Sequence, residues 1–388
     1  MIDLFVFCGE MSGDLHGEKI LSQLLEQNPH LNIAGVAGPR MRTLDLLCLI
    51  PMESFQVMGF VDVFMAFPRL LKLFYQVKRT ILKQNPKVVL CIDYPEFSLK
   101  LAKALKRAGF KGKILHFISP TVWAWRKKRI ETVASSLDRL FVIFPFEVNF
   151  YREQGCETKV EFVGHPLIER FPSIPSRTSS EPVQKIALFP GSRKKEILRN
   201  FPIQLQVIRR LLQKYPSLEI HVSVSHPRFS SLIESALHRY NLKAQCQLFD
   251  HKNCYATMST CDLAIAKSGT VTLELALLAV PTIVTYGISF LDLMIAKHLF
   301  KIDLPHYCIV NIIAQKRVFP ELFGPFFNEA ALFDTASRLI ENSALRDSMR
   351  QDCHAVRALL GEKKVSVEMA QILQKELLSK FSNTGIGS

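Results

Sequence analysis

The sequence predicts an α/β protein made of two doubly wound, Rossmann-like domains that face each other across a cleft. Short apolar runs alternate with longer amphipathic ones, which is typical of βαβ units and parallel sheets. A Pro- and Ser-rich stretch, PSIPSRTSSEPVQ, interrupts this alternation at 172–184, and the alternation restarts after it. We therefore expect a first domain at 1–170, a linker at 171–184 and a second domain at 185–362. A C-terminal helix at 363–380 follows, and the sequence leaves open whether it packs back on the first domain.

The strands are expected where β-branched and aromatic residues form short runs. In the first domain these runs lie at 4–8, 32–37, 87–92, 113–118 and 140–144. In the second domain they lie at 185–190, 218–225, 244–249, 262–266 and 281–286. Segments of helical period, such as SLKLAKALKRAG at 98–109, lie between them. Ligands of such sheets bind beyond the carboxyl ends of the strands, so the loops after the strands are the candidate sites.

Composition narrows the class of protein. The chain of 388 residues is 48% hydrophobic and 22% charged, which is typical of globular proteins. Its start, IDLFVFCG, lacks the basic segment of a signal peptide, so we expect a cytoplasmic protein. In that compartment its nine cysteines should be reduced. The longest uncharged run, at 275–291, contains Pro281 and Gly287 and is shorter than a membrane span needs.

One group of residues has the chemistry of zinc ligands. Cys246, His251, Cys254 and Cys261 lie close together in the sequence but lack paired CxxC spacing. We expect no metal site there, and buried thiols instead.

The positive charge is concentrated in one segment. The net charge is +14, and residues 63–139 contain 17 Lys and Arg against 4 Asp and Glu. The stretch FISPTVWAWRKKR at 117–129 holds both tryptophans of the chain. Such a segment favours an anionic partner: nucleic acid, an anionic membrane or a phosphorylated substrate. The domain type has none of the usual nucleic-acid-binding modules, so we expect no nucleic acid.

Two turns in the first domain carry acidic residues at strand ends. FCGEMSGDLHGE at 7–18 places Glu10, Ser12 and Asp14 between a strand and a helix, where Asp14 would otherwise be a helix cap. CIDYPEF at 91–97 places Asp93 directly after a strand. A carboxylate at that position is suited to act as a general base.

Two turns in the second domain suit a diphosphate. LFPGSRKKEI at 188–197 joins the amides of Gly191 and Ser192 to the forked donors of Arg193. KSGTVTLELAL at 267–277 offers bare amides at Ser268, Gly269 and Thr270, with Glu274 one helical turn further on. The chain has no DxD motif, so protein cations and helix ends would have to balance the charge of a nucleotide diphosphate. From the residues alone we expect a two-domain enzyme with a nucleotide diphosphate in its C-terminal half.

The motifs together resemble those of the lipid-A-disaccharide synthases. They match in order and span nearly the whole chain: GEMSGD (9–14), AGPRM (37–41), VMG (57–59), ISPTVWAWR (118–126), PFE (145–147), FVGHPL (162–167), PGSR (190–193), SGTVTLE (268–274) and PEL (320–322). The resemblance implies an inverting glycosyltransferase of the two-domain GT-B fold that needs no cofactor. Its substrates would be UDP-2,3-diacylglucosamine and 2,3-diacylglucosamine 1-phosphate (lipid X), and its products lipid A disaccharide 1-phosphate and UDP.

The resemblance also implies roles for single residues. Asp93 would deprotonate the acceptor hydroxyl, with Glu10 and Asp14 in reserve. Arg193 and the amides of both second-domain turns would stabilise the leaving diphosphate, and Glu274 would hold the ribose. The chain departs from the family pattern at Glu96, to which we therefore assign no role. It also departs at Val310 and at 315–316, so we assign no nucleotide contacts to 310–323.

The substrates that the resemblance implies would give the basic segment two anionic partners, the phosphate of the acceptor and the surface of a membrane. FQVMGFVDVFMAFPRLLKLFYQVKRTILK at 55–83 combines apolar and basic residues, and Pro68 should divide it into two helices. The alternative is a helix pair in the domain core. The candidate acceptor and membrane residues are Ser12, Phe64, Phe67, Arg69, Lys72, Trp123, Trp125, Arg126, Lys128 and Arg129. The protein would be peripheral on the inner face of the bacterial inner membrane, with its oligomeric state open, a homo-oligomer included.

Two other functions fit parts of the pattern. A UDP-N-acetylglucosamine epimerase or hydrolase of the same fold would use similar diphosphate turns without the apolar basic segment. A non-catalytic membrane-docking protein would need neither Asp93 nor Arg193.

Overall fold

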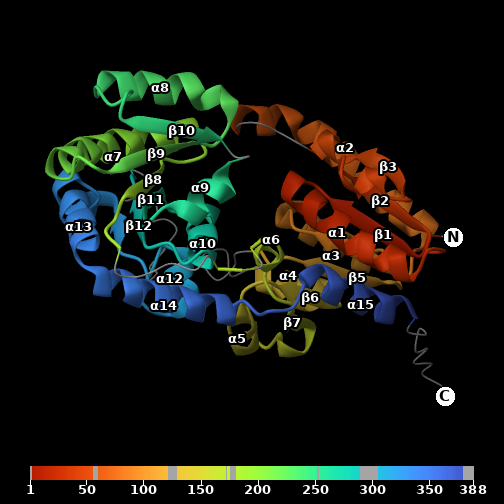
Figure 1. Ribbon diagram of the computed structural model, residues 1–388. Coiled ribbons are helices and arrows are strands. Elements are labelled where there is room, and N and C mark those ends of the chain that lie inside the picture. Colours follow the sequence, from red (N-terminus) through yellow and green to blue (C-terminus); the bar gives the residue numbers. More distant parts are fainter. Residues whose placement is uncertain are drawn as a thin grey trace, which may run out of the picture. The chain divides into compact units, whose positions relative to one another are not determined.

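The computed structural model describes residues 2–55, 60–120, 129–171, 173–174, 181–250, 253–288 and 305–378, except the side chains of 60–67 and 157. The chain forms two compact units (Figure 1). Unit 1 contains Met1–Glu169 together with Glu362–Ser388, and unit 2 contains Arg170–Gly361. The C-terminal segment thus belongs to the same unit as the N-terminus.

Unit 1 is built on a parallel sheet of seven strands in the order β3-β2-β1-β4-β5-β6-β7. Its strands are β1 Leu4–Cys8, β2 Ile33–Ala37, β3 Leu47–Pro51, β4 Val88–Ile92, β5 Lys113–Phe117, β6 Arg139–Val142 and β7 Val160–Phe162. All residues of β1, β2 and β4 are buried, because helices cover both faces of a parallel sheet. In β1, Phe5 and Phe7 belong to one core cluster, and Leu4, Val6 and Cys8 to the other.

The helices of unit 1 divide between these two clusters. They are α1 Met11–Gln27, α2 Phe60–Gln84, α3 Pro95–Arg107, α4 Arg129–Ser136, α5 Pro145–Glu153, α6 Leu167–Arg170 (its last residue in unit 2) and α15 Val365–Leu378, with short 3-10 turns η1 Met41–Thr43, η2 Met52–Phe55 and η3 Glu157–Lys159. Residues of α2, α3 and α4 pack into the cluster of Phe5 and Phe7. Residues of α1 and α15 pack into the cluster of Leu4 and Val6.

The helix α2 differs from the prediction. Pro68 lies inside one continuous helix and does not divide it into two. Proline removes one backbone hydrogen bond, which a helix of 25 residues can lose while its remaining turns persist.

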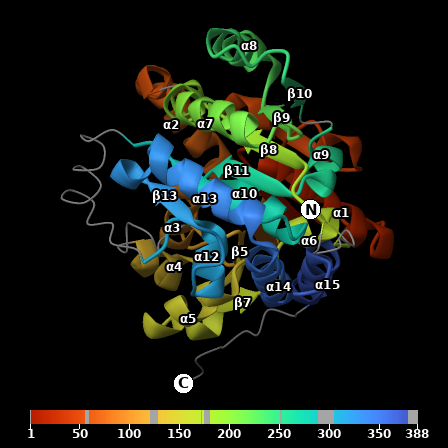
Figure 2. The ribbon, with the colours of Figure 1, turned by 60° about the vertical axis from the view of Figure 1, so that its left-hand side comes forward.

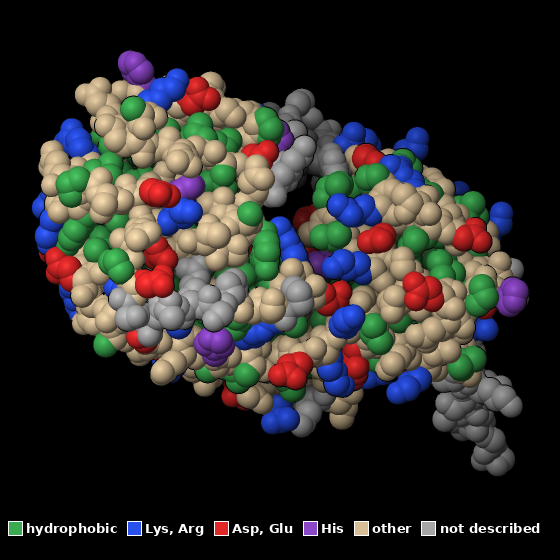
Figure 3. All heavy atoms as spheres, in the orientation of Figure 1, with side chains coloured by type: hydrophobic (Ala, Val, Ile, Leu, Met, Phe, Trp, Pro, Cys, Tyr) green, Lys and Arg blue, Asp and Glu red, His purple; other side chains and the backbone are tan. Residues whose placement is uncertain are grey.

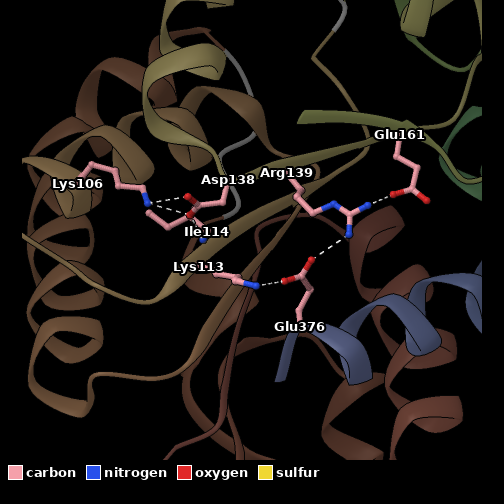
Figure 4. A network of polar contacts seen from close by, with 7 residues as sticks. All are labelled: Lys106, Lys113, Ile114, Asp138, Arg139, Glu161 and Glu376. Carbon is pink, nitrogen blue, oxygen red and sulfur yellow. Dashed lines mark hydrogen bonds and ion pairs between the residues drawn. The ribbon is translucent and has the colours of Figure 1, made fainter. Parts of the chain in front are cut away.

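The helix α15 is joined to the sheet by ion pairs (Figure 4). Glu376 accepts hydrogen bonds from Lys113 at the start of β5 and from Arg139 at the start of β6, the latter over 2.9 Å. Arg139 also pairs with Glu161 of β7. The last of the described helices therefore contacts two strands of the first unit's sheet through charged groups, in addition to its apolar face, and Arg139 extends this network to β7.

Unit 2 repeats the architecture with a parallel sheet of six strands in the order β10-β9-β8-β11-β12-β13. Its strands are β8 Lys185–Phe189, β9 Glu219–Val224, β10 Cys246–Asp250, β11 Leu263–Lys267, β12 Thr282–Tyr286 and β13 Glu321–Phe323. Its helices and 3-10 turns are α7 Lys194–Lys214, η4 Pro227–Phe229, α8 Ser230–Arg239, α9 Cys254–Thr260, α10 Thr270–Leu277, α12 Ile309–Ala314, η6 Gly324–Phe326, α13 Glu329–Glu341 and α14 Ser343–Leu359. Figure 2 shows α7 and α13 side by side, and the two helices are in contact.

Each sheet has one point where the order of its strands reverses. In unit 1 this point lies between β1 and β4, and in unit 2 between β8 and β11. The loops at the carboxyl ends of these four strands carry the four motifs that the sequence singles out. Ligands of doubly wound sheets bind at such a reversal.

Charged side chains of both signs are distributed over the surface of the described residues (Figure 3). Lys and Arg side chains are interspersed with Asp and Glu over the face seen in Figure 3. None of the helices described combines the length and the apolar character that crossing a membrane requires.

Candidate active site

The strand-end site of unit 1 is formed by the loops after β1 and β4. Asp93 and Tyr94 follow β4 with φ of +53° and +54°, left-handed conformations that non-glycine residues rarely adopt. The Tyr94 ring packs on Gly9 after β1, where a Cβ atom would lie only 2.6 Å from the ring. The Tyr94 hydroxyl donates a hydrogen bond to the carbonyl of Phe55 over 3.2 Å. This packing fixes the turn that carries Asp93.

Asp93 has the surroundings of a proton acceptor. Burial raises the pKa of its carboxyl, and a hydrogen bond from the Tyr94 amide to Oδ1, 2.8 Å long, only partly offsets this effect. The main chain of Asp93 is held at both ends, by Phe117 O and by the hydroxyl of Ser98. Its side chain is therefore positioned by the backbone and has a higher proton affinity than an exposed aspartate.

Glu10 is the second carboxylate of this site. Burial raises the pKa of Glu10, and the negative charge of Asp93 raises it further. The structure thus brings together the residues that the sequence placed 83 positions apart. Ser12 follows Glu10 by two residues and is exposed in the first turn of α1.

Asp14 has a different environment from the other two carboxylates. It is fully buried, and its two oxygens accept hydrogen bonds from the amides of Arg40 and Met41, over 2.8 and 3.1 Å. Gly38 is required beside it, because a Cβ atom there would lie 2.4 Å from the carboxyl carbon of Asp14. Asp14 therefore holds the turn of the AGPRM motif, and we remove it from the candidate bases.

The basic candidates of unit 1 are only partly described. Arg129 begins α4 and pairs with Glu96, and Arg69 and Lys72 are exposed on α2. Trp123, Trp125, Arg126 and Lys128, the side chains of Phe64 and Phe67, and the VMG motif at 57–59 lie outside the described residues.

The first turn of unit 2 follows β8. Gly191 has a φ of +134°, and the side chain of Arg193, 82% exposed, follows at the N-cap of α7. The amide of Ser192 is not free, because it donates to Oε2 of Glu196 over 3.0 Å. This corrects the expectation that the Ser192 amide is available to a ligand. Among the described residues the Gly191 amide has no acceptor.

The second turn of unit 2 follows β11. The Ser268 amide donates to Thr285 O over 2.9 Å, so it continues the sheet and is not bare as the sequence suggested. Gly269 and Thr270 begin α10, and within the described part of the chain their amides donate to no acceptor. The amides that remain for an anion are thus those of Gly191, Gly269 and Thr270.

Glu274 and Arg170 form an ion pair in unit 2. Nη1 of Arg170 lies 3.2 Å from Oε1 of Glu274. Burial raises the pKa of Glu274, and the charge of Arg170 acts in the opposite direction. Arg170 comes at the end of α6, about 100 residues before Glu274 in the sequence, and no motif pointed to it.

An aromatic stack lies beside the second turn. Phe323 stacks on Tyr286 with ring centroids 5.2 Å apart and on Tyr307 with centroids 4.1 Å apart. Glu321 accepts hydrogen bonds from the amides of Tyr307 and Cys308 and from the side chain of Asn311. Glu321 and Asn311 are thus used to shape the 305–323 segment.

Comparisons with known proteins were made over the whole chain. The family model described as lipid-A-disaccharide synthetase matches residues 4–376. The lipid-A-disaccharide synthase of Geobacter metallireducens is 34% identical over 385 residues, which is 97% of each chain. That of Chlamydia trachomatis serovar D is 36% identical over 373 residues, 94% of this chain but 61% of the relative's length. The chain thus spans less than two thirds of the chlamydial relative.

Solved structures with this fold have little sequence identity to the chain. A UDP-GlcNAc 2-epimerase from Neisseria meningitidis has a TM-score of 0.56 and 12% identity, covering 98% of this chain and 100% of its own. A glycosyltransferase from Rickettsia africae has a TM-score of 0.52 and 14% identity, covering 98% and 99%. These neighbours show that the two parallel sheets form a GT-B-like fold.

Proposed function

Because the chain belongs to the lipid-A-disaccharide synthetase family, we propose that it joins UDP-2,3-diacylglucosamine to 2,3-diacylglucosamine 1-phosphate and releases UDP. The match to the family over residues 4–376 is the observation that carries this proposal. The two sites at the strand-order reversals support it, because one offers a proton acceptor and the other offers donors to an anion.

The site of unit 2 would hold the UDP part of the donor. As the bond between the anomeric carbon and the diphosphate breaks, negative charge develops on the phosphate oxygen. The amides of Gly191, Gly269 and Thr270 and the guanidinium of Arg193 are donors that stabilise such charge. Glu274 would accept hydrogen bonds from the ribose hydroxyls, and the charge of Arg170 favours the ionised form of its carboxylate.

The site of unit 1 would activate the acceptor. A sugar hydroxyl is a weak acid, so its attack on the anomeric carbon needs a base that removes the proton in the transition state. Asp93 is the proposed base, since burial raises its proton affinity and its turn fixes its position. The negative charge of Asp93 raises the proton affinity of the neighbouring Glu10, which stays the reserve base.

The helix α2 would bind the membrane that contains both substrates. Leu71 and Tyr75 lie one turn apart on it and are 43% and 59% exposed. Arg69 and Lys72 are exposed beside them. Apolar side chains flanked by cations suit the interface of an anionic leaflet. The protein would thus be peripheral on the cytoplasmic face of the inner membrane, where its acylated substrates are.

The first test is UDP release by the purified protein in mixed detergent micelles. We expect release from UDP-2,3-diacylglucosamine only when lipid X is present, with a disaccharide detected by mass spectrometry. Asp93→Asn should lower the rate by about 10²- to 10⁴-fold, because it removes the base and keeps the shape. Glu219→Gln, at the opposite end of the unit 2 sheet, should leave the rate unchanged.

Other outcomes would identify other functions. Turnover of UDP-N-acetylglucosamine without an acceptor would indicate an epimerase or a hydrolase. Binding of anionic liposomes without release of UDP from either donor would indicate a membrane-docking protein. An Asp93→Asn variant with a normal rate would remove Asp93 from the mechanism and make Glu10 the candidate base.

A further inference from the structure

A partly buried ion pair connects the two turns that would bind the diphosphate. Nζ of Lys267, the last residue of β11, lies 3.0 Å from Oε1 of Glu196 in the first turn of α7. The two side chains are 15% and 14% exposed. Since β8 and β11 are neighbours in the sheet, the pair joins the loops that leave two adjacent strand ends.

Glu196 does more than cap its own helix. A glutamate at the third position of a helix commonly bonds the amide of the N-cap residue. Here Oε2 takes the amide of Ser192, one residue earlier, and Oε1 takes Lys267 from another strand. Gly191 packs directly on Glu196, because a Cβ atom at Gly191 would lie 2.7 Å from the Cβ of Glu196. The carboxylate is thus enclosed by both turns.

A carboxylate at this place is unfavourable for binding an anion unless its charge is balanced. Arg193, the candidate diphosphate ligand, has its Nη1 3.6 Å from the same Oε1 that Lys267 contacts. The two cations therefore compete for one carboxylate. Lys267 is held toward it by the Tyr286 ring, with Nζ 4.9 Å from the ring centroid, whereas the Arg193 side chain is mostly exposed.

We propose that Lys267 is a positioning residue that neutralises Glu196 and thereby leaves the Arg193 guanidinium free to bind the diphosphate. The inference rests on the proposed function, because it assumes that this site binds UDP. Without Lys267, Glu196 would keep Arg193 as its counter-ion and would repel the diphosphate. Lys267 acts through Arg193 and need not touch the nucleotide.

The binding of UDP and of uridine tests this role. We expect Lys267→Met to weaken UDP binding about tenfold in calorimetry. Uridine binding should stay unchanged, because uridine has no diphosphate, whereas general damage to the fold would weaken both ligands. Glu219→Gln is the matched control: Glu219 also pairs with a lysine, Lys185, across two strands, but at their amino ends.

The double variant separates positioning from direct contact. In Lys267→Met/Glu196→Gln no carboxylate remains to hold Arg193, so UDP affinity should return to within about threefold of the wild type. If Lys267 bound the phosphates itself, the double variant would stay as weak as Lys267→Met, and that result would overturn the proposal. The comparison of Glu196→Gln with the double variant gives the same decision even if Lys267→Met alone does not fold.

Failure of this inference can be told apart from failure of the proposed function. A wild-type protein that binds no UDP contradicts both. A wild-type protein that binds UDP, with Lys267→Met equally tight, contradicts only the role of Lys267.

Discussion

At the scale of single residues, three carboxylates of unit 1 show how surroundings decide a role. Asp93 and Glu10 have few hydrogen-bond donors around them, so burial raises their pKa values. Asp14 is more deeply buried, yet both of its oxygens receive backbone amides, which is the environment of a structural carboxylate. Sequence spacing alone could not separate them, because all three follow strands within a few residues, in Gly- or Pro-containing segments.

Asp14 and Asp93 should therefore respond differently to the same substitution. Asp14→Asn turns one acceptor oxygen into an NH₂ group that faces a backbone amide, so we expect the free energy of unfolding to fall by about 1–3 kcal/mol. Asp93→Asn should leave the unfolding free energy nearly unchanged and abolish most turnover. Urea unfolding and UDP release, measured on both variants well below their melting temperatures, check this contrast. Loss of turnover without loss of stability in Asp14→Asn would return Asp14 to the candidate bases.

At the scale of elements, the C-terminal helix shows how a distant segment completes a unit. The apolar face of α15 packs against α1, and Glu376, with its side chain 10% exposed, contacts Lys113 and Arg139. Burial would raise the pKa of Glu376, but the hydrogen bonds from Lys113 and Arg139 and their charges lower it. The contribution of such a pair is modest, because both cations are partly exposed to water.

We expect Glu376→Gln to lower the free energy of unfolding of unit 1 by roughly 1 kcal/mol, since the two cations lose their shared anion. Glu341→Gln removes the partner of Lys214 on the surface of unit 2 and should cause no measurable change. Urea unfolding followed by circular dichroism compares the two variants. Equal stability of Glu376→Gln and the wild type would show that apolar packing alone holds α15.

At the scale of the whole molecule, one half-buried and two buried histidines should make the protein sensitive to acid. Burial lowers the pKa of His16 and of His116 to about 4 and that of His165 to about 3. The charge of Lys19 lowers the pKa of His16 further. The charge of His16 does the same at His165. All three pKa values lie below the ordinary value of 6.5, so the folded protein binds fewer protons than the unfolded chain. The stability that these neutral histidines provide is present above pH 6.5 and is lost as the pH falls toward 4.

Thermal unfolding between pH 7.5 and pH 4.5 measures this dependence. We expect the melting temperature to fall steadily below about pH 6.5 and the slope to be smaller in His116→Leu, which has one titrating group fewer. A melting temperature that stays constant down to pH 4.5 would contradict the prediction. The raised pKa values of Glu10, Asp93 and Glu274 act in the opposite direction, because protonation of these groups costs the folded protein less than the unfolded chain.

The sequence predicted the buried parts of this fold better than its edges. Strands such as β1 and β4 are continuous apolar runs and were predicted, since burial on both faces requires that composition. The strands β3, β7 and β13 were missed, because they are partly exposed edge strands with mixed composition. The continuity of α2 across Pro68 depends on packing, which a local rule does not include.

Some residues of the candidate site lie in sequence motifs and could be predicted. Others are identified only by their neighbours in the folded structure and were missed. Glycine turns at strand ends marked Gly191 and Gly269, and the structure leaves their amides unoccupied in the part of the chain it describes. The hydrogen bonds that occupy the Ser192 and Ser268 amides depend on Glu196 and on the neighbouring strand, so a motif could not reveal them. The roles of Arg170 and Lys267 likewise follow from spatial neighbours.

The chain crosses from unit 1 to unit 2 and back again, and this order affects folding during synthesis. Unit 2 is one continuous segment, and it can fold as soon as the ribosome has made it. Unit 1 must wait for α15, which is synthesised only after all of unit 2. Until then Ile20, Leu21 and Leu24 of α1 lack part of the apolar cover that they have in the finished protein. The nascent chain therefore carries an uncovered apolar surface while all of unit 2 is translated, and we expect chaperones to bind this surface.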